Sequence, residues 1–469
     1  MTYQDLLGNM VVTNVTYVIK EVFMFSKKVK KGYVLYQNEN GPEIGTAKDR
    51  VIIQDGYIFK DLAGTGELLP YEDWRLGYEE RARDLAARLP VEMIAGLMLY
   101  SPHQMVPGMP DSPFPGKYKG EDFPDSGCEP WEMSDQQKEF LAQDHIRHVL
   151  VSTYQDTRTA VRWQNSVQAY TEDLPFGIPV NFSLDPRHGA SDSDAEYKSG
   201  AGEVSKWPEG IGMAALFDPK RVKEFAEIVS REYRALGITT ALGPQIDLAT
   251  DPRWMRLQDT LGLDWERTVK MTRAYCDGLQ TTENAEDGWG RDSVNAMVKH
   301  WPGGGTGEGG RDAHYAFGQF AVYPGGKFQE HLKPFTEGAF CLEGPTKKAA
   351  SVMPYYTVSW EQDKKNHENV GNSYSEYMIK DLLRGKYGYD GVVCTDWDIT
   401  ADPGADLDDF GSRCYGTENL TVAQRHLRII MNGVDQFGGN QDKKPVMEAY
   451  DMGCQLYGEE AMRRRMEES

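Results

Sequence analysis

"VNAMVKH", residues 294–300, is a short apolar run that ends on Lys299 and His300. A run of this length without polar alternation predicts a strand that is buried on both faces. The two polar residues stand at its end, just before a segment with six glycines between Gly303 and Gly310. The same arrangement, an apolar strand followed by polar residues, recurs along the chain and decides the predicted fold.

Further strands of this kind are predicted from about residue 90 onward, and helical periodicity separates them, as in residues 220–237 and 421–433. Eight strand–helix units predict an α/β fold: a (β/α)8 TIM-type barrel, or alternatively a doubly wound open sheet. The eight predicted strands cover residues 93–99, 146–152, 178–185, 239–247, 294–300, 349–356, 391–397 and 434–439.

The ends of the predicted strands distinguish the two folds. Asp185, Asp247, Lys299, Tyr356 and Asp396 each follow a different apolar run. In a barrel the carboxyl ends of all strands meet at one mouth, whereas an open sheet gathers such residues at one switch point. Polar residues on this many strands favour the barrel.

Two domains are predicted: an N-terminal extension over residues 1–74 and the barrel over residues 75–469, with no second α/β domain after it in this chain. The extension contains "DLAGTGELLPYE", which has the length of a calcium loop, with Asp61 first and Glu72 last. Ala63 and Leu69 occupy its third and ninth positions and offer no side-chain oxygen. A turn-rich segment without a metal ion is therefore expected.

Composition excludes several classes of partner. The 51 Lys and Arg residues against 72 Asp and Glu give a formal charge of −21, which disfavours nucleic acid and anionic membranes. No apolar run is long enough to cross a bilayer, and the N-terminus lacks the pattern of a signal peptide, so a cytoplasmic location is expected. The six cysteines lack metal-ligand spacing and are expected to be free thiols. No cofactor is predicted.

The glycine run could suggest a nucleotide site, because "GTGEGG" matches G-x-G-x-x-G. That pattern binds a pyrophosphate only where it joins a strand to a helix, and no helical period follows here.

At another strand end, Asp396 precedes Trp397. A carboxylate beside a large aromatic face suits a nucleophile or base next to a stacked sugar, and a helix N-cap is the alternative.

Three segments in this order, "DPRWMR" (251–256), "KHWPGGG" (299–305) and "GVVCTDW" (391–397), resemble glycoside hydrolase family 3. "GIPVNFSLDPRHGA" (177–190) and "GVDQFGG" (433–439) fit the same family, so the resemblance extends from about residue 75 to the end. It implies the (β/α)8 fold and retaining hydrolysis of a β-linked sugar at a non-reducing end, as in a β-glucosidase.

The resemblance also implies a role for each matching residue. Asp396 would be the nucleophile that forms a glycosyl-enzyme, and Trp397 would flank the leaving group. Tyr356 would lie under the anomeric carbon. The residues implied to bind sugar hydroxyls are Asp185, Arg256, Lys299 and His300. Met255 and Asp259 depart from the family's usual Gly and Glu, so the loop that carries Arg256 is expected to differ.

The acid/base group has two possible sources. Many two-domain members of the family take a Glu from an α/β domain after the barrel, which a second chain or a missing C-terminal portion would have to supply here. Alternatively, "GRDAH" resembles a loop of single-domain members in which a His, here His314, is the acid/base and an Asp, here Asp312, orients it. The glycines are then expected to form a hinge-like loop that brings His314 to the pocket.

The predicted function is therefore that of a retaining, exo-acting β-glycosidase, with a β-linked glycoside as substrate. A catalytically incomplete carbohydrate-binding or scaffolding subunit of a hetero-oligomeric glycosidase is the alternative. The carboxylate at Asp396 favours the enzyme, because a binding protein does not need a nucleophile at that place.

Overall fold

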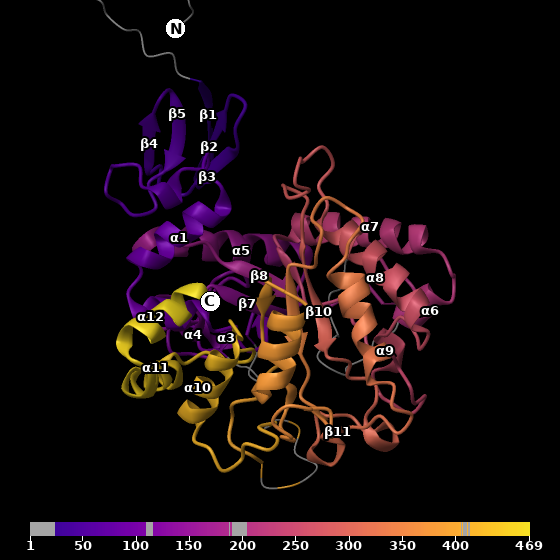
Figure 1. The fold of residues 1–469 in the computed structure, drawn as a ribbon. Coiled ribbons are helices and arrows are strands. Elements are labelled where there is room, and N and C mark those ends of the chain that lie inside the picture. Colours follow the sequence, from indigo (N-terminus) through magenta and orange to yellow (C-terminus); the bar gives the residue numbers. More distant parts are fainter. Residues whose placement is uncertain are drawn as a thin grey trace, which may run out of the picture. The chain divides into compact units, whose positions relative to one another are not determined.

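The computed structural model describes residues 24–108, 116–186, 188–189, 204–404, 406, 410 and 413–469. The chain divides into two compact units, residues 1–82 and 83–469 (Figure 1). The division falls inside helix α1 (Tyr78–Arg88), and the boundary predicted after residue 74 lies just before that helix. Residues 1–23 of the predicted extension, and Arg187 and Ala190 of the motif at residues 177–190, lie outside the described part.

The first unit contains two small antiparallel sheets. Its core is formed by Tyr36, Ile44 and Ile58, against which Trp74 packs. Alternating burial along β3 places Ile44 inward, as expected for a strand with one solvated face. The three-stranded sheet is β1 (Phe25–Lys30), β2 (Tyr33–Asn38) and β3 (Glu43–Thr46), and the hairpin is β4 (Val51–Gln54) and β5 (Tyr57–Lys60).

The segment from Asp61 to Glu72 forms a turn held by its own carboxylates. Asp61 accepts the backbone N–H groups of Thr65 and Gly66, at 2.9 and 3.2 Å. Glu72 accepts those of Ala63 and Leu69, at 2.7 and 2.9 Å. All four carboxylate oxygens thus bind backbone amides of the turn itself.

The second unit is built on a closed parallel sheet. Seven of its strands pair in one continuous order, and the segment with Gln436 and Phe437 is the eighth. Gln436 pairs with Cys394 beyond one edge strand, and Phe437 pairs with Leu99 beyond the other, so the sheet closes into a (β/α)8 barrel. The seven strands are β6 (Gln104–Val106), β7 (His148–Tyr154), β8 (Asn181–Leu184), β9 (Thr240–Ala241), β10 (Asn295–Trp301), β12 (Ser351–Pro354) and β14 (Val392–Val393).

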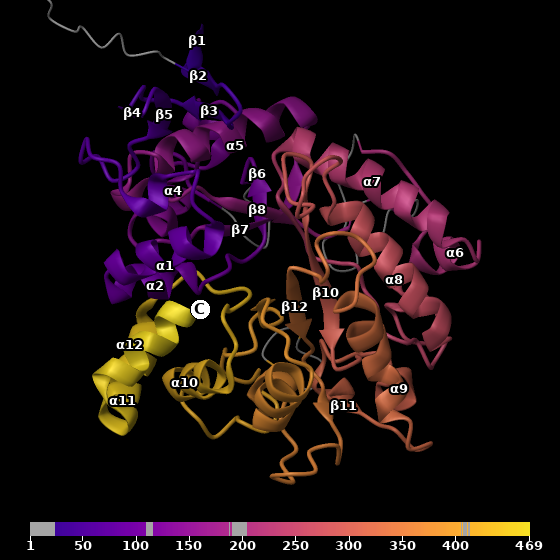
Figure 2. The ribbon, with the colours of Figure 1, turned by 45° about the horizontal axis from the view of Figure 1, so that its top comes forward.

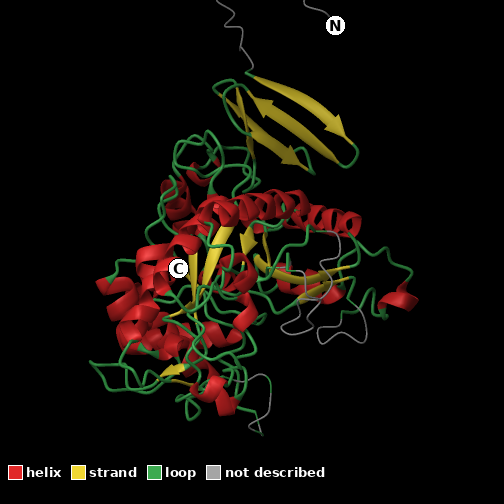
Figure 3. Ribbon diagram, turned by 90° about the vertical axis from the view of Figure 1, so that its right-hand side faces the viewer, coloured by secondary structure: helices red, strands yellow, loops and turns green. Residues whose placement is uncertain are grey.

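Helices surround these strands (Figure 3), and α7, α8 and α9 follow one another outside β10 (Figure 2). The predicted α/β barrel is confirmed. The helices are α2 (Val91–Leu97), α3 (Phe123–Ser126), α4 (Asp135–Ala142), α5 (Thr157–Thr171), α6 (Gly210–Ala214), α7 (Pro219–Leu236), α8 (Trp265–Gln280), α9 (Phe328–Lys333), η7 (Pro334–Ala339), η9 (Tyr377–Lys386), α10 (Val422–Asn432), α11 (Lys444–Tyr457) and α12 (Glu459–Glu468), and a separate pair of short strands is β11 (Phe320–Ala321) and β13 (Val358–Ser359).

Local sequence sets the ends of several helices. The Asp156 side chain accepts the Thr159 N–H at the start of α5, and Thr421 accepts the Gln424 N–H at the start of α10. Helix α7 ends at Gly237, whose φ of 86° is open to glycine but unfavourable for other residues. Gly237 therefore ends the helix with a left-handed residue.

The predicted strand at residues 93–99 is wrong over most of its length. Residues 91–97 form helix α2, and strand pairing begins only at Leu99. An apolar run this short fits a buried helix as well as a buried strand, so tertiary packing decides. Helix α2 packs closely at Gly96, where a Cβ would lie 2.2 Å from the carbonyl oxygen of Asp144.

One layer of buried side chains, which come from strands and strand ends, lies inside the barrel. Side chains fill the interior of a small barrel in this way. The layer consists of Tyr100, Leu150, Leu242, Met297, Met353, Cys394 and Trp397. All six cysteines are free thiols, as predicted. Among the described residues, no helix has the length and apolar character needed to cross a membrane.

An ion pair fixes the closing strand. Asp435 accepts the Val393 N–H at 2.9 Å and a guanidinium N–H of Arg384 at 2.6 Å. Arg384 also donates to the carbonyl oxygens of Tyr389 and Gly391. These contacts join η9, β14 and the eighth strand at the place where the sheet closes.

We expect Asp435→Ala to lower the free energy of unfolding by about 3 kcal/mol, because it leaves Arg384 without its buried counter-charge. Urea denaturation followed by circular dichroism measures this change. The control is Glu460→Ala, which removes one partner of an exposed ion pair on α12 and should leave stability unchanged. Equal effects of the two substitutions would contradict the role given to Asp435.

Candidate active site

The barrel mouth gathers the polar residues that follow the strands. These side chains come from five different strands and are all nine-tenths or more buried, so most of their polar atoms need partners within the mouth. They are Asp185 after β8, Asp247 after β9, Lys299 and His300 in β10, Tyr355 and Tyr356 after β12, and Asp396 and Trp397 after β14.

Lys299 pairs with Asp185. Its ammonium group donates to a carboxylate oxygen of Asp185 at 2.9 Å, and the two side chains are 7% and 10% exposed. Asp185 is itself held by its backbone carbonyl oxygen, which accepts the Tyr233 hydroxyl. Because β9 lies between β8 and β10, this ion pair spans the end of β9.

Lys299 and His300 both contact groups of the mouth, although neighbouring side chains of a regular strand point to opposite faces. The pairing of β10 with β12 shifts between Lys299 and Trp301. The Lys299–His300 and Trp301–Pro302 peptides are both cis. The strand is therefore irregular between Lys299 and Trp301, where His300 is placed.

His300 is oriented from both sides. Its Nδ1 lies 2.7 Å from a carboxylate oxygen of Asp247, and its Nε2 lies 3.1 Å from a guanidinium nitrogen of Arg256. Since arginine can only donate, Nε2 accepts and Nδ1 carries the proton. Asp247 also accepts the backbone N–H groups of His300 and Gly304. Its complete burial nevertheless raises the pKa of Asp247 to about 6.

Asp396 presents one carboxylate oxygen to the mouth. Its Oδ1 accepts the N–H of Trp397 at 2.8 Å. Its Oδ2 is buried, has no hydrogen-bond partner among the described residues, and lies 3.7 Å from Nε2 of His300. Turns rather than a helix follow, so Asp396 does not act as a helix N-cap. A buried anionic oxygen without a donor is available to a ligand.

Tyr356 and Arg413 connect the Asp396 strand end to the following loops. The Tyr356 hydroxyl accepts the Trp397 N–H and a guanidinium N–H of Arg413, each at 3.2 Å. Arg413 also donates to the carbonyl oxygens of Trp397 and His314, and its guanidinium lies 4.3 Å from the centre of the Tyr356 ring. Arg413 is 3% exposed. The sequence analysis missed it, because it follows no apolar run and belongs to no motif.

His314 lies beside this group. Its Nδ1 is 2.5 Å from a carboxylate oxygen of Asp312, and its ring meets the Tyr356 ring at a centroid distance of 4.9 Å. Asp312 also accepts the Trp254 indole N–H and the Tyr355 hydroxyl. Burial opposes ionisation of Asp312, but His314 and its hydrogen bonds hold the pKa of Asp312 well below its usual value. No described residue hydrogen-bonds to Nε2 of His314.

The glycine run is a close-packed segment rather than the expected hinge. A Cβ on Gly304 would lie 2.6 Å from the Tyr355 ring, and one on Gly305 would lie 2.1 Å from the Leu248 carbonyl oxygen. Residues 303–306 are buried. The glycines therefore let the backbone pass between the loop after β9 and the β12 end, which fixes the path toward His314.

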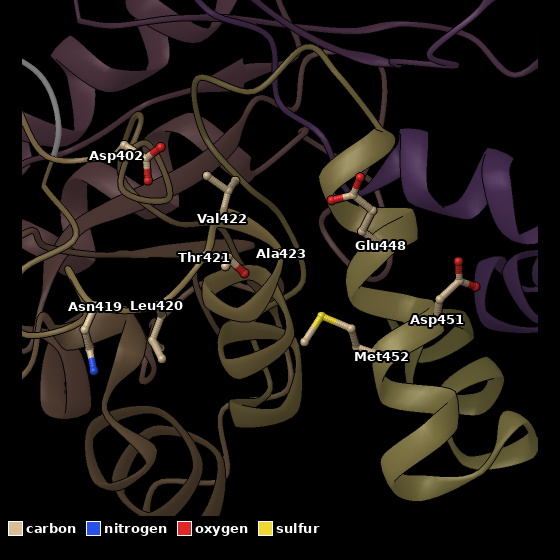
Figure 4. Close-up of a pocket in the computed structure, with 9 residues that line it drawn as sticks. All are labelled: Asp402, Asn419, Leu420, Thr421, Val422, Ala423, Glu448, Asp451 and Met452. Carbon is tan, nitrogen blue, oxygen red and sulfur yellow. The ribbon is translucent and has the colours of Figure 1, made fainter.

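The structure also has a groove of about 770 Å³ between α10 and α11 (Figure 4). It contains none of the site residues predicted from the sequence. Its lining is Asp402, Asn419, Leu420, Thr421, Val422, Ala423, Glu448, Asp451 and Met452.

Comparison with known proteins identifies the barrel. Residues 110–405 match the family model described as the glycosyl hydrolase family 3 N terminal domain. A periplasmic beta-glucosidase/beta-xylosidase of Dickeya chrysanthemi is 37% identical over 418 residues, 86% of this chain and 60% of that protein. A probable beta-glucosidase C of Aspergillus oryzae is 34% identical over 385 residues, 82% of this chain and 55% of that one.

The solved structure of a β-glucosidase from Erythrobacter marinus shares the fold, with a TM-score of 0.59 at 22% identity, over 85% of this chain and 45% of that chain. The present chain thus spans 55% to 60% of the length of the two curated relatives named above.

We expect Gly305→Ala to lower the free energy of unfolding by about 1–3 kcal/mol, because its methyl group would overlap the Leu248 carbonyl oxygen. Gly325→Ala is the matched control, since its nearest neighbour is 3.9 Å away on the flexible Lys327 side chain. Urea denaturation compares the two. A Gly305 variant as stable as the control would show that the segment yields like a hinge.

Proposed function

The chain belongs to glycosyl hydrolase family 3, and on that premise we propose that it carries the nucleophile and sugar subsite of a retaining, exo-acting β-glycosidase. The proposal rests on Oδ2 of Asp396 at the barrel mouth, which has no hydrogen-bond partner in the described part of the chain. The other charged groups of the mouth are paired, so a positively polarised anomeric carbon is the partner that this oxygen fits.

In the proposed first step Oδ2 of Asp396 attacks the anomeric carbon, and the bond from that carbon to the leaving-group oxygen breaks. A proton donor protonates the departing oxygen. In the second step the deprotonated acid/base group takes a proton from a water molecule, whose oxygen attacks the same carbon. The bond from that carbon to Asp396 breaks, the carboxylate is restored, and the sugar leaves with its β configuration. The Trp397 N–H holds Oδ1, which fixes the carboxylate for both steps.

The sugar would lie over Asp185, Arg256, Lys299 and His300. The charges of these residues are already balanced by ion pairs and hydrogen bonds within the mouth, so their positions do not depend on substrate. Hydrogen bonds from such fixed groups to ring hydroxyls strengthen as the oxocarbenium-like transition state forms. The curated relatives act on β-glucosides and β-xylosides by name, which supports a pyranose of this kind.

The acid/base group has two candidate sources, which an experiment separates. His314 is supported by its Asp312 partner, which would stabilise an imidazolium, by its contact with the Tyr356 ring, and by an Nε2 to which no described residue hydrogen-bonds. A Glu from a further domain or a second chain is the other candidate.

The cytoplasmic location stays a prediction from the sequence, and the Dickeya relative is named periplasmic. A catalytically incomplete carbohydrate-binding subunit remains the second candidate function. The labelling experiment below distinguishes it from the enzyme.

We expect a 2-deoxy-2-fluoro β-glucoside with an activated leaving group to form a covalent adduct on the peptide that contains Asp396, because the fluorine slows hydrolysis of the glycosyl-enzyme. Mass spectrometry of the digested protein measures it. Asp396→Asn should abolish labelling. Asp398→Asn, two residues along, is the matched control and should retain it. An unlabelled wild-type chain that still binds the sugar would favour the binding subunit.

We expect His314→Ala to slow hydrolysis of alkyl β-glucosides by about 100-fold or more, and of dinitrophenyl β-glucoside by less than about fivefold, if His314 is the proton donor. An activated leaving group departs without protonation, which explains the difference. Steady-state kcat/KM values for both substrates measure it. Phe410→Leu is the control, since it removes the ring stacked on His314 but no proton. Equal losses on both substrates would place the acid/base outside this residue.

A further inference from the structure

Gln245 faces the inside of the barrel mouth. It pairs with Lys299 in the parallel register, where Lys299 donates its N–H to the Pro244 carbonyl oxygen and accepts the N–H of Ile246. Residues paired in this way place their side chains on the same face of a sheet. Since the Lys299 side chain reaches into the mouth to Asp185, the Gln245 side chain starts in the same direction.

The carboxamide of Gln245 is buried without a partner. The residue is 4% exposed, and neither Oε1 nor Nε2 has a hydrogen-bond partner among the described residues. Gln280, which is also fully buried, instead donates to Thr346 and accepts the N–H groups of Ala296 and Ala350. A buried amide normally finds such partners, so an unpaired one in the mouth points to a ligand.

The order of strands tells which part of a sugar Gln245 would meet. In the eight-stranded ring β8 is the third strand and β14 the seventh, so the end that carries Asp396 lies opposite Asp185. Gln245 follows β9, between Asp185 and Lys299. A ring with its anomeric carbon at Asp396 therefore turns its far hydroxyls toward Gln245.

We propose that Gln245 is a specificity-determining residue that binds two adjacent ring hydroxyls of the non-reducing-end sugar, on the side away from the anomeric carbon. Nε2 donates to one hydroxyl oxygen, and Oε1 accepts the proton of its neighbour. The substrate class is then pyranosides whose hydroxyls on that side are free. The inference rests on the proposed glycosidase function.

The test compares Gln245→Met with wild type on an aryl β-glucoside and on its 3-deoxy, 4-deoxy and 6-deoxy analogues. We expect kcat/KM on the parent substrate to fall by about 10- to 100-fold in the variant. On each of the two analogues that lack one of the bound hydroxyls, the difference between wild type and variant should shrink to about 3- to 10-fold, because one of the two hydrogen bonds is already lost. The remaining analogue should show the full difference. Gln164→Met is the matched control: Gln164 is also buried with an unpaired Oε1, but it lies on α5.

A uniform loss on all four substrates, or no loss on any, would overturn the role of Gln245. If the Met variant does not fold, Gln245→Glu makes the same comparison, because it removes the donor and keeps an acceptor. Labelling of Asp396 in the wild-type chain separates the two hypotheses. If Asp396 is labelled but Gln245→Met changes kcat/KM equally on the parent substrate and all analogues, only the role of Gln245 is rejected. If Asp396 is not labelled, the glycosidase function itself is rejected.

Discussion

Closure of the parallel sheet is the constraint on which the site depends. Two short backbone pairings achieve it, Cys394 with Gln436 and Phe437 with Leu99. They place the end of β14 opposite the end of β8, so that Asp396 and Asp185 face each other across one mouth. In an open sheet with the same strands these two carboxylates would lie far apart, and no single sugar ring could meet both.

Burial then dictates how the charges of the mouth are arranged. A charge shielded from water needs a partner, and the structure supplies one for Lys299 in Asp185 and for His314 in Asp312. Oδ2 of Asp396, the indole N–H of Trp397 and the carboxamide of Gln245 differ, because they lack hydrogen-bond partners among the described residues. In the proposed complex the anomeric carbon of the pyranose lies at Asp396 and its far hydroxyls lie at Gln245.

Arg413 extends the site beyond the strand ends. It binds the carbonyl oxygens of Trp397 and His314 and the hydroxyl of Tyr356, and so couples the proposed nucleophile to the loop with the candidate proton donor. A change in this loop would therefore be felt at Asp396 through Tyr356. Through these contacts His314 would influence the position of Asp396, whether His314 or a further domain supplies the proton.

The sequence by itself determined the barrel and most of its mouth, because buried parallel strands need continuous apolar runs and polar residues stand out at their ends. Asp185, Lys299, His300 and Asp396 were found in this way. Tertiary structure alone decided that residues 91–97 are helical, that the glycines pack closely, and that Arg413 and Gln245 face the site. The reason is physical: these features depend on strand register and on contacts between distant segments, which no local pattern encodes.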